Sequence, residues 1–472
     1  PTLPVPVDVL DETPYVELHM HSNYSLLEGA SSLDELVTAA REQSHRALAL
    51  TDHNGLYGAM EFARTAKESG LRPIIGLELT LAETDSEDGT RSHITLLAQS
   101  RQGYSNLCRL SSIAFGLQEE SDEGKEERRL DPCVDIALLE AHAEGLIALT
   151  GCREGALRRL IEEAQPARAE QALRRLVGWF GADNVFVELQ DNLVFGDRPR
   201  NRALIALAER VGVGVVGTGN VHYHEQDRHR LQDVMVAIRH RKTLDECHRE
   251  RRPNAEFYLR SPQEQAQRFD ATHPQAAANS VRIARRCNFD LTADLGYRLP
   301  SPQLEDSDRT PLQQLEHICR ERQMERYAAS PPADQREAEQ RLADEITLVS
   351  KHDLAGFFLI YHQIFQLAKE VATEIRGPSV GRNQANLPPG RGRGSSVSSI
   401  ICYLVGLSHI DPIKNKLFVG RFLNEEMHSF PDIDLDFARD IRAELIERVY
   451  TVWGKEHAAL VATFPTYRLR SA

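Results

Sequence analysis

The chain has 472 residues and a formal net charge of −14, from 56 Lys and Arg against 70 Asp and Glu. At roughly 100–200 residues per domain this length predicts two to four domains, and the acidic balance excludes a wholly basic nucleic-acid coat but not a locally basic groove. The seven Cys form no close pairs, which argues against a disulfide scaffold or a zinc ribbon and indicates a reducing cytoplasm. No apolar run approaches the ~18 residues that span a bilayer.

Short aliphatic runs alternate with helical spacing over the first part of the chain. Apolar residues recur at i, i+3, i+4 and i+7 from Leu33 to Ala40 and from Ala59 to Ala66, which predicts two helices. The alternation predicts a parallel α/β sheet or barrel, interrupted by an acidic loop at residues 83–89 between hairpin-like strands. The aliphatic runs occupy residues 15–18, 46–50, 73–81, 146–150, 185–189 and 213–217.

Residue types that bind metals follow these predicted strands or lie within them. In parallel α/β folds the site gathers at the carboxyl ends of the strands, and imidazole, carboxylate and thiolate groups hold Zn²⁺ or Mn²⁺. A single buried His is more often a core residue than a ligand, but the recurrence at successive strands favours a metal cluster. We expect most other histidines, His45 among them, at the solvated surface. The candidates are His19, His21, Asp52, His53, Glu78, Cys152, Asn220 and His222.

Six segments in this region are ELHMHSNYSLLEGA, ALTDHNGLYGA, IIGLEL, HITLLA, TGCREG and TGNVHYH. In this order they resemble the polymerase-and-histidinol-phosphatase (PHP) domain, in its form at the N-terminus of bacterial C-family DNA polymerases. The resemblance implies a distorted (β/α) barrel with a Zn²⁺ or Mn²⁺ site, and Asp52 as the partner that orients His53. The metal ligands that it implies are His19, His21, Glu28, His53, Glu78, His93, Cys152, Asn220 and His222.

Two of these positions depart from the family's pattern. Glu28 and Asn220 stand where metal-binding members usually have Asp. An Asn carbonyl can ligate a metal ion, but it carries no charge. We therefore expect a weakened metal site with feeble or absent nuclease or phosphoesterase activity.

A polar connector occupies residues 225–290, where RHRKTLDECHRERRPNAEFYLRSPQE concentrates Arg and Lys. A solvated surface is the favoured interpretation, ahead of a DNA contact. The stretch LPSPQLEDSDRT is typical of a linker. Thr310 and Pro311 then predict the start of a helix, and GFFLIYHQIFQLAKEV predicts a buried one further on.

Two motifs in the second half suit phosphate chemistry. RGRGSS precedes a predicted helix, SVSSIICYLVGL, and combines close backbone approach, N–H groups at a helix start and fixed positive charge. A flexible linker is the alternative. In PDIDLDF, a strand would place Asp432, Asp434 and Asp436 on one face. Neighbouring carboxylates of this kind usually hold divalent cations, although an exposed edge strand would also fit.

The segments GRGSSVSSIICYLVGLSHIDP, GRFLNEE and PDIDLDF resemble the palm of C-family polymerases, which shares its phosphate loop and Asp-x-Asp strand with beta-type nucleotidyltransferases. The resemblance implies DNA-directed DNA polymerase activity on primer–template DNA and dNTPs, with two Mg²⁺ ions. Asp434 and Asp436 would be the metal ligands, with Asp432 a weaker candidate. The nucleotide-binding residues would be Arg393, Gly394 and Ser395. IICYLVGLSHIDP and HAALVATFPTYRLRSA most resemble the error-prone, damage-tolerant branch.

The resemblance divides the chain into a PHP domain at residues 1–290, a linker at 291–310, a partial α+β palm at 311–465 and the start of a truncated segment at 466–472. The family's third catalytic carboxylate and clamp-binding region lie further downstream. We therefore expect an N-terminal portion that does not extend a primer alone, with a sliding clamp and other replication or repair proteins as partners of the full-length form. The alternatives are a stand-alone PHP-type phosphoesterase and an inactive truncated product. A phosphoesterase needs no triphosphate loop, which favours the polymerase.

Overall fold

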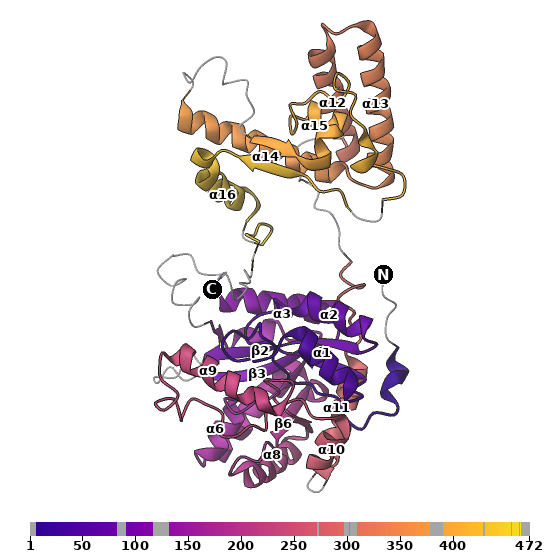
Figure 1. Ribbon diagram of the computed structural model, residues 1–472. Helices are drawn as coiled ribbons and strands as arrows, with labels where there is room; N and C mark the ends of the chain where they lie inside the picture. The colour runs from indigo at the N-terminus through magenta and orange to yellow at the C-terminus, as the bar shows by residue number, and fades with distance from the viewer. Residues whose placement is uncertain are drawn as a thin grey trace. The chain divides into compact units, whose positions relative to one another are not determined.

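The computed structural model describes residues 6–82, 91–116, 132–270, 273–296, 302, 309–377, 390–427, 430–454, 456–461 and 463. Its contacts divide the chain into two units, Pro1–Gly296 and Tyr297–Ala472 (Figure 1). Each unit has its own hydrophobic core. The division falls within the predicted linker at residues 291–310. The domain boundaries themselves remain predictions.

A curled seven-stranded sheet forms the centre of the first unit in the part of the chain that the structure describes. All its pairings are parallel except those of β3, which runs antiparallel to both β2 and β5. The antiparallel pair of β2 and β3 agrees with the hairpin-like strands expected on either side of residues 83–89. The strands are β1 Ala47–Leu50, β2 Arg72–Ala82, β3 Arg91–Ala98, β4 Val134–Asp135, β5 Leu146–Leu149, β6 Val185–Gln190 and β7 Gly214–Thr218.

Residues 17–21 connect the two ends of this sheet. The amide N of Ala49 in β1 donates to the carbonyl O of Glu17 (2.9 Å), and the N of Val221, beyond β7, donates to the O of His19 (2.9 Å). The predicted strand at residues 15–18 is thus a bridging segment, because its hydrogen bonds switch from one neighbour to the other. This bridge closes the sheet into a distorted barrel and confirms the predicted α/β class.

The barrel interior is packed with side chains from each strand along the sheet path. Because these side chains fill it, the barrel formed by the described residues offers no channel, and a functional site has to lie at one of its ends. The interior cluster includes Leu18, Ala49, Ile74, Leu97, Leu149, Phe186 and Val216.

Helices cover the outside of the barrel (Figure 1). The two helices predicted from apolar spacing are confirmed as α1 and α2, and α1 begins at a capping box between Ser32 and Glu35. The acidic loop predicted at residues 83–89 lies outside the described residues. The helices are α1 Leu33–Glu42, α2 Ala59–Glu68, α3 Arg101–Ala114, α5 Leu138–Ala141, α6 Ala156–Glu162, α7 Pro166–Phe180, α8 Asp197–Val211, α9 His229–His240, α10 Pro262–Asp270 and α11 Gln275–Arg286.

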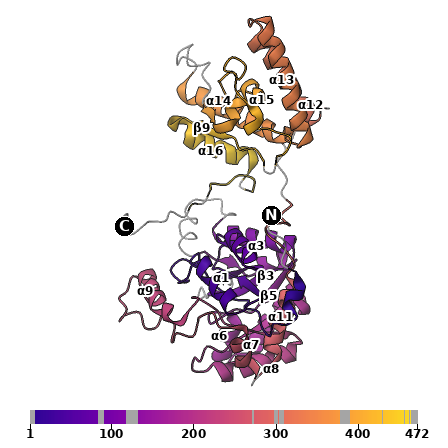
Figure 2. The same cartoon turned by 45° about the vertical axis from the view of Figure 1, so that its right-hand side comes forward.

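The second unit packs helices around a main apolar core beside a two-stranded antiparallel sheet. Figure 2 shows these helices. The predicted start at Thr310 is confirmed, because its side-chain oxygen accepts from the N of Gln313. The apolar stretch predicted as a helix forms α14. Among the described residues, no helix combines the length and hydropathy needed to cross a bilayer. The elements are α12 Pro311–Tyr327, α13 Pro332–Lys351, α14 Ala355–Arg376, β8 Gly390–Arg393, α15 Ile400–Leu404, β9 Asp434–Phe437 and α16 Arg439–Trp453.

Candidate functional site

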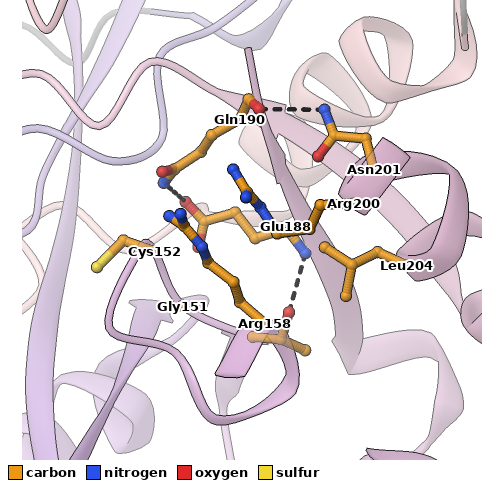
Figure 3. Close-up of a pocket in the computed structure, with 9 residues that line it drawn as sticks. Gly151, Cys152, Arg158, Glu188, Gln190, Arg200, Asn201 and Leu204 are labelled. Carbon is orange, nitrogen blue, oxygen red and sulfur yellow. Dashed lines mark hydrogen bonds between the residues drawn. The ribbon is translucent and has the colours of Figure 1, made fainter. Parts of the chain in front are cut away.

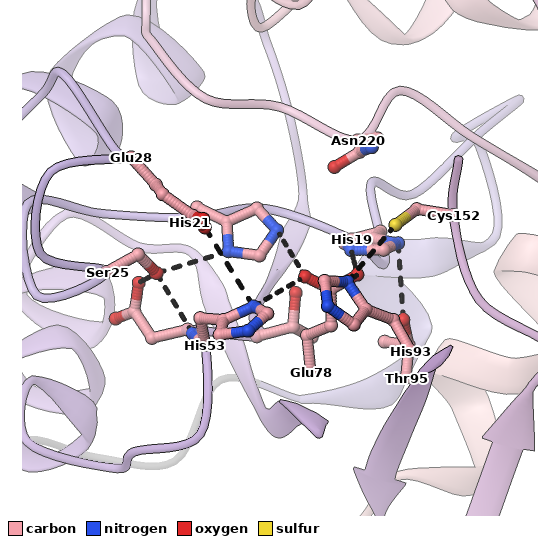
Figure 4. A network of polar contacts seen from close by, with 12 residues as sticks. His19, His21, Ser25, Glu28, His53, Glu78, His93, Thr95, Cys152 and Asn220 are labelled. Atoms are coloured by element: carbon pink, nitrogen blue, oxygen red, sulfur yellow. Dashed lines mark hydrogen bonds and ion pairs between the residues drawn. The ribbon is translucent and has the colours of Figure 1, made fainter. Parts of the chain in front are cut away.

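Four histidines surround the carboxylate of Glu78 at one end of the barrel (Figure 4). Oε1 of Glu78 lies 3.2 Å from Nε2 of His19 and 3.4 Å from Nδ1 of His93. Oε2 lies 3.4 Å from Nε2 of His21 and 3.0 Å from Nδ1 of His53. One buried carboxylate thus lies between four imidazole rings.

The fold brings these side chains together from four separate segments. His19 and His21 are two residues apart on the bridging segment at residues 17–21, and their ring centroids are 5.2 Å apart. His53 follows β1, and Glu78 lies within β2. His93 lies near the start of β3, which reaches the same edge because β3 runs antiparallel to β2.

The donor set fits a divalent metal ion. His19, His21 and Glu78 form one group, and His53, Glu78 and His93 a second, each offering ligand atoms within 4.8 Å of one another. Nε2 of His21 is buried without a hydrogen-bond partner in the described structure, as expected of a ligand atom. Imidazole and carboxylate groups in this combination suit Zn²⁺ or Mn²⁺.

The remaining candidate ligands lie around this centre at different depths. Sγ of Cys152 is 3.7 Å from Nδ1 of His93, and the ring of His222 is centred 4.4 Å from that of His21. Asn220 points toward the same space (Figure 4), and both atoms of its amide are buried without partners among the described residues. Glu28 lies at the rim, with Oε2 3.9 Å from Nδ1 of His53.

A carboxylate that the sequence interpretation missed stands behind His19. Oε1 of Glu188, in β6, lies 2.6 Å from Nδ1 of His19 and accepts from the hydroxyl of Thr218 at 2.5 Å. This contact fixes the ring and directs Nε2 toward Glu78. Glu188 could have been found in the sequence as a charged residue inside the apolar run VFVEL.

The role expected of Asp52 is wrong in its details. Its carboxylate accepts from the N of Ser22 and the hydroxyl of Ser25, both at 2.7 Å, and orients neither nitrogen of the His53 ring. The hydroxyl of Ser25 in turn lies 3.1 Å from Nδ1 of His21. Asp52 therefore organises the turn that follows His21.

The connector after β7 is a solvated surface only in part: residues 238–246 are exposed, as the favoured interpretation expects, but two of its later arginines are not. Arg260 is buried, with 3% of its surface exposed. The Arg252 side chain turns inward and donates a hydrogen bond to Nε2 of His222, and Arg239 of α9 forms an ion pair with Glu28. Two guanidinium groups from this segment thus contact residues expected to bind metal.

Burial and charge act against each other in this cluster. Burial disfavours protonation of His19, but the carboxylates of Glu188 and Glu78 outweigh it and raise its pKa to about 10. Burial opposes ionisation of Glu78, yet His93 and His19 hold its pKa well below the usual range. Burial and the Arg252 charge lower the pKa of His222. Glu78 is therefore ionised, as a metal ligand must be.

A small cavity lies on the other side of Glu188, bordered by Cys152, Gln190, Arg158 and Arg200 (Figure 3). Its volume is about 20 Å³, which is close to that of a single water molecule. This cavity is too small for a nucleotide or a phosphate ester, so it is not a substrate site.

In the second unit, the two phosphate-chemistry motifs pair with each other. Arg393 stands opposite Asp434 and Arg391 opposite Asp436 in the antiparallel ladder of β8 and β9. Directly opposed residues share one face of a sheet, so two guanidinium groups and two carboxylates lie on the same face. Nε of Arg393 is 3.1 Å from Oδ2 of Asp436. Asp432 precedes the strand.

The glycines of β8 explain its alternating sequence. A Cβ at Gly390 would lie 2.5 Å from the carbonyl O of Asp436, and one at Gly392 would lie 2.8 Å from that of Leu407. Both contacts are too close for any side chain. Glycine is therefore required on one face of β8, while the other face carries the arginines.

The loop after β8 differs from its prediction. Residues 391–396 do not lead directly into a long helix: β8 ends at Arg393, a 3₁₀ turn spans Gly394–Ser398, and α15 has only five residues. Glu345 of α13 fixes the start of α15, because its carboxylate accepts from the hydroxyl of Ser399 (2.6 Å) and the N of Ile400 (3.0 Å). Gly394 has a φ of 68°, which favours glycine.

Comparison with protein families matches both units. The PHP domain matches residues 17–192, and the bacterial DNA polymerase III alpha NTPase domain matches residues 313–472. A solved protein from Bifidobacterium adolescentis described as a metal-dependent phosphoesterase is 16% identical with a TM-score of 0.31, covering 44% of this chain and 87% of that one. That overlap is too slight to inform the site.

Curated relatives align with nearly the whole chain. The DNA polymerase III subunit alpha of Treponema pallidum is 35% identical over 465 residues, which are 97% of this chain and 37% of the relative. The error-prone DNA polymerases of Symbiobacterium thermophilum and Mycobacterium tuberculosis are 35% and 36% identical, again over 97% of this chain and 40% of each relative. The chain thus spans about 40% of the length of these relatives. Over nearly its whole length, the chain is similar to bacterial DNA polymerase III alpha subunits and error-prone DNA polymerases.

Proposed function

We propose that this protein acts in DNA-directed DNA synthesis of the error-prone type, adding deoxynucleotides to a primer 3′ end during replication or damage-tolerant repair in the cytoplasm. The observation that carries the proposal is the β8–β9 ladder, which sets Arg391 and Arg393 beside Asp434 and Asp436. Nucleotidyl transfer needs cations around a triphosphate and carboxylates that hold metal ions, and both stand on one face of this sheet.

The exposure of these side chains supports a substrate-binding role. The Arg393 and Asp436 side chains are 59% and 43% exposed, so a nucleotide and metal ions can reach them. Asp434 and Asp436 would hold two Mg²⁺ ions, which supply electrostatic stabilisation of the transferred phosphoryl group. Arg393, Gly394 and Ser395 would bind the triphosphate. Primer–template DNA is the proposed second substrate, and a sliding clamp a proposed partner.

Binding of dNTPs tests this site directly. Asp434→Ala or Asp436→Ala should abolish Mg²⁺-dependent binding of a fluorescent dNTP, and should abolish primer extension in the longest form of the protein that its gene encodes. Asp432→Ala should have a smaller effect, because Asp432 lies before the strand. Asp440→Ala is a matched control, since the Asp440 carboxylate pairs with Arg376. Unchanged binding in both Asp434→Ala and Asp436→Ala would contradict the proposal.

For the first unit, we propose a divalent metal site centred on Glu78, with His19, His21, His53 and His93 around it. Bound Zn²⁺ or Mn²⁺ would supply Lewis-acid chemistry. Asn220 contributes no charge to the site, so 3′–5′ exonuclease activity should be feeble or absent. Rapid degradation of primer ends in the presence of Mn²⁺, lost on Glu78→Gln, would show that the site is instead a competent nuclease.

A further inference from the structure

Arg252 directs its guanidinium group at a nitrogen that would otherwise face the metal pocket. Nδ1 of His222 lies 2.8 Å from the carbonyl O of Asn220. A carbonyl oxygen can only accept, so Nδ1 carries the proton and Nε2 carries the lone pair. Arg252 donates to this Nε2. The lone pair that a metal ion would need is therefore already engaged by a cation.

The surroundings of Arg252 offer its positive charge few partners other than the pocket. In the described parts of the chain, no carboxylate lies within ion-pair distance of Arg252, and its Nε is buried without a hydrogen-bond partner. The guanidinium carbon lies 4.5 Å from the centre of the Phe257 ring. An unpaired charge is unfavourable away from water. The ionised carboxylate of Glu78, which attracts this charge, belongs to the pocket.

Asn220 lies beside His222 in the pocket and carries no charge. Both atoms of its amide are buried and have no partner in the described structure. A carboxylate at this position would attract a metal ion and offset the repulsion between that ion and Arg252. The neutral amide does neither, so the corner formed by Asn220 and His222 favours the guanidinium.

We propose that Arg252 is a resident cation that keeps metal ions out of the His222 corner, so that the pocket holds metal only through Glu78 and the histidines around it. The inference rests on the proposed metal-binding role of the pocket. It assigns Arg252 as the residue that limits how many ions the pocket takes and how tightly it holds them.

Metal titration of the whole chain tests this role without measuring activity. Zn²⁺ and Mn²⁺ are titrated by calorimetry, and bound metal is counted by mass spectrometry after dialysis. Arg252→Met should bind metal on the order of tenfold more tightly or at a higher stoichiometry, because Nε2 of His222 is released. Arg251→Met is the matched control and should bind as the wild type does, since Arg251 pairs with Asp233 at 2.9 Å.

Two further variants make the outcome decisive. In a His222→Ala background, Arg252→Met should bring no gain, because the released ligand is absent. Arg252→Lys keeps the charge and should bind as the wild type does. Equal affinity and stoichiometry in the wild type and Arg252→Met would overturn the proposal, and so would an undiminished gain without His222. If Arg252→Met fails to fold by circular dichroism, Arg252→Gln carries the same test. Absence of metal from all the folded proteins would instead contradict the metal site itself.

Discussion

At the scale of single residues, Glu188 decides which nitrogen of His19 faces the metal pocket. Its carboxylate lies 2.6 Å from Nδ1 of His19, which leaves Nε2 directed at Glu78. Glu188→Gln removes the charge that holds the ring. Because partners behind a ligand typically change metal affinity ~10–100-fold, the dissociation constant for Zn²⁺ should rise by about that factor.

Calorimetric titration of the whole chain measures this effect. Glu170→Gln is the control, since Glu170 pairs with Arg174 on the outer surface of α7. Identical Zn²⁺ affinity in Glu188→Gln and the wild type would show that the His19 ring is held by its other contacts, such as that of Thr95 at 3.3 Å.

His45, which is not among the proposed metal ligands, gives the protein an acid-sensitive point. It was expected at the surface, but it is 2% exposed, and its Nε2 donates to the carbonyl O of Arg260 at 2.9 Å. Burial lowers its pKa from 6.5 to about 4. The unfolded chain therefore binds a proton at His45 more readily than the folded chain does. The stabilisation of the folded state by neutral His45 is complete above pH 6.5 and is lost as the pH falls towards 4.

The free energy of unfolding should consequently fall by on the order of 2 kcal/mol between about pH 7.5 and pH 5 through His45 alone. In urea unfolding, the free energy of unfolding of His45→Gln should depend less on pH than that of the wild type, by this amount. His240→Gln, at an exposed position, should show the same pH dependence as the wild type. Equal pH dependence in His45→Gln and the wild type would contradict the assignment.

The sequence predicted residue types well but not which partners they would have. His19, His53 and His222 could be selected because metal-binding side chains follow apolar runs. Glu188 was missed, because one carboxylate inside an apolar strand has no periodic pattern. Arg252 was missed because it lies 30 positions beyond His222 in a segment whose charge indicated a solvated surface. Contacts between such distant positions depend on the fold, which local patterns do not encode.

At the scale of elements, Glu345 joins α13 to the loop that follows β8. Its buried carboxylate accepts from Ser399 and from the N of Ile400 and Ile401. Burial raises the pKa of Glu345, while these donors favour its charged form. Glu345→Gln cannot satisfy all of them, and should lower the free energy of unfolding by about 1–3 kcal/mol.

The same variant should weaken dNTP binding, because the turn that carries Ser395 leads directly into α15. Urea unfolding and titration with a fluorescent dNTP measure the two effects. Glu339→Gln, at an exposed position of the same helix, should change neither, and Glu345→Asp should restore part of both. A loss of stability with unchanged dNTP affinity would show that Glu345 supports the fold alone.

Most elements could be predicted from apolar periodicity, and the exceptions have physical causes. The antiparallel pair of β2 and β3 was expected, but the antiparallel pairing of β3 with β5 was not, because alternation shows that a strand exists but not which strand it pairs with. Residues 17–21 form no regular strand because they bond to two neighbours in turn. The predicted helix after RGRGSS is short, since Gly406 at a φ of 92° follows closely after α15.

At the scale of the whole molecule, the two units have separate cores, and the proposed Zn²⁺ or Mn²⁺ ligands, Glu78 and the histidines around it, lie in the first. A ligand that binds only the folded state stabilises the part that holds it, by ~2.7 kcal/mol at a hundredfold excess over the dissociation constant. Urea unfolding of the whole chain should therefore show two transitions, of which Zn²⁺ or Mn²⁺ shifts only one.

Two tryptophans allow the transitions to be distinguished, because Trp179 lies in α7 of the first unit and Trp453 in α16 of the second. In a Trp453→Phe variant, the remaining fluorescence should report the metal-sensitive transition. In Trp179→Phe it should report a transition that metal leaves unchanged and that Glu345→Gln moves to lower urea. A single transition, shifted equally for both reporters, would show that the two cores unfold together.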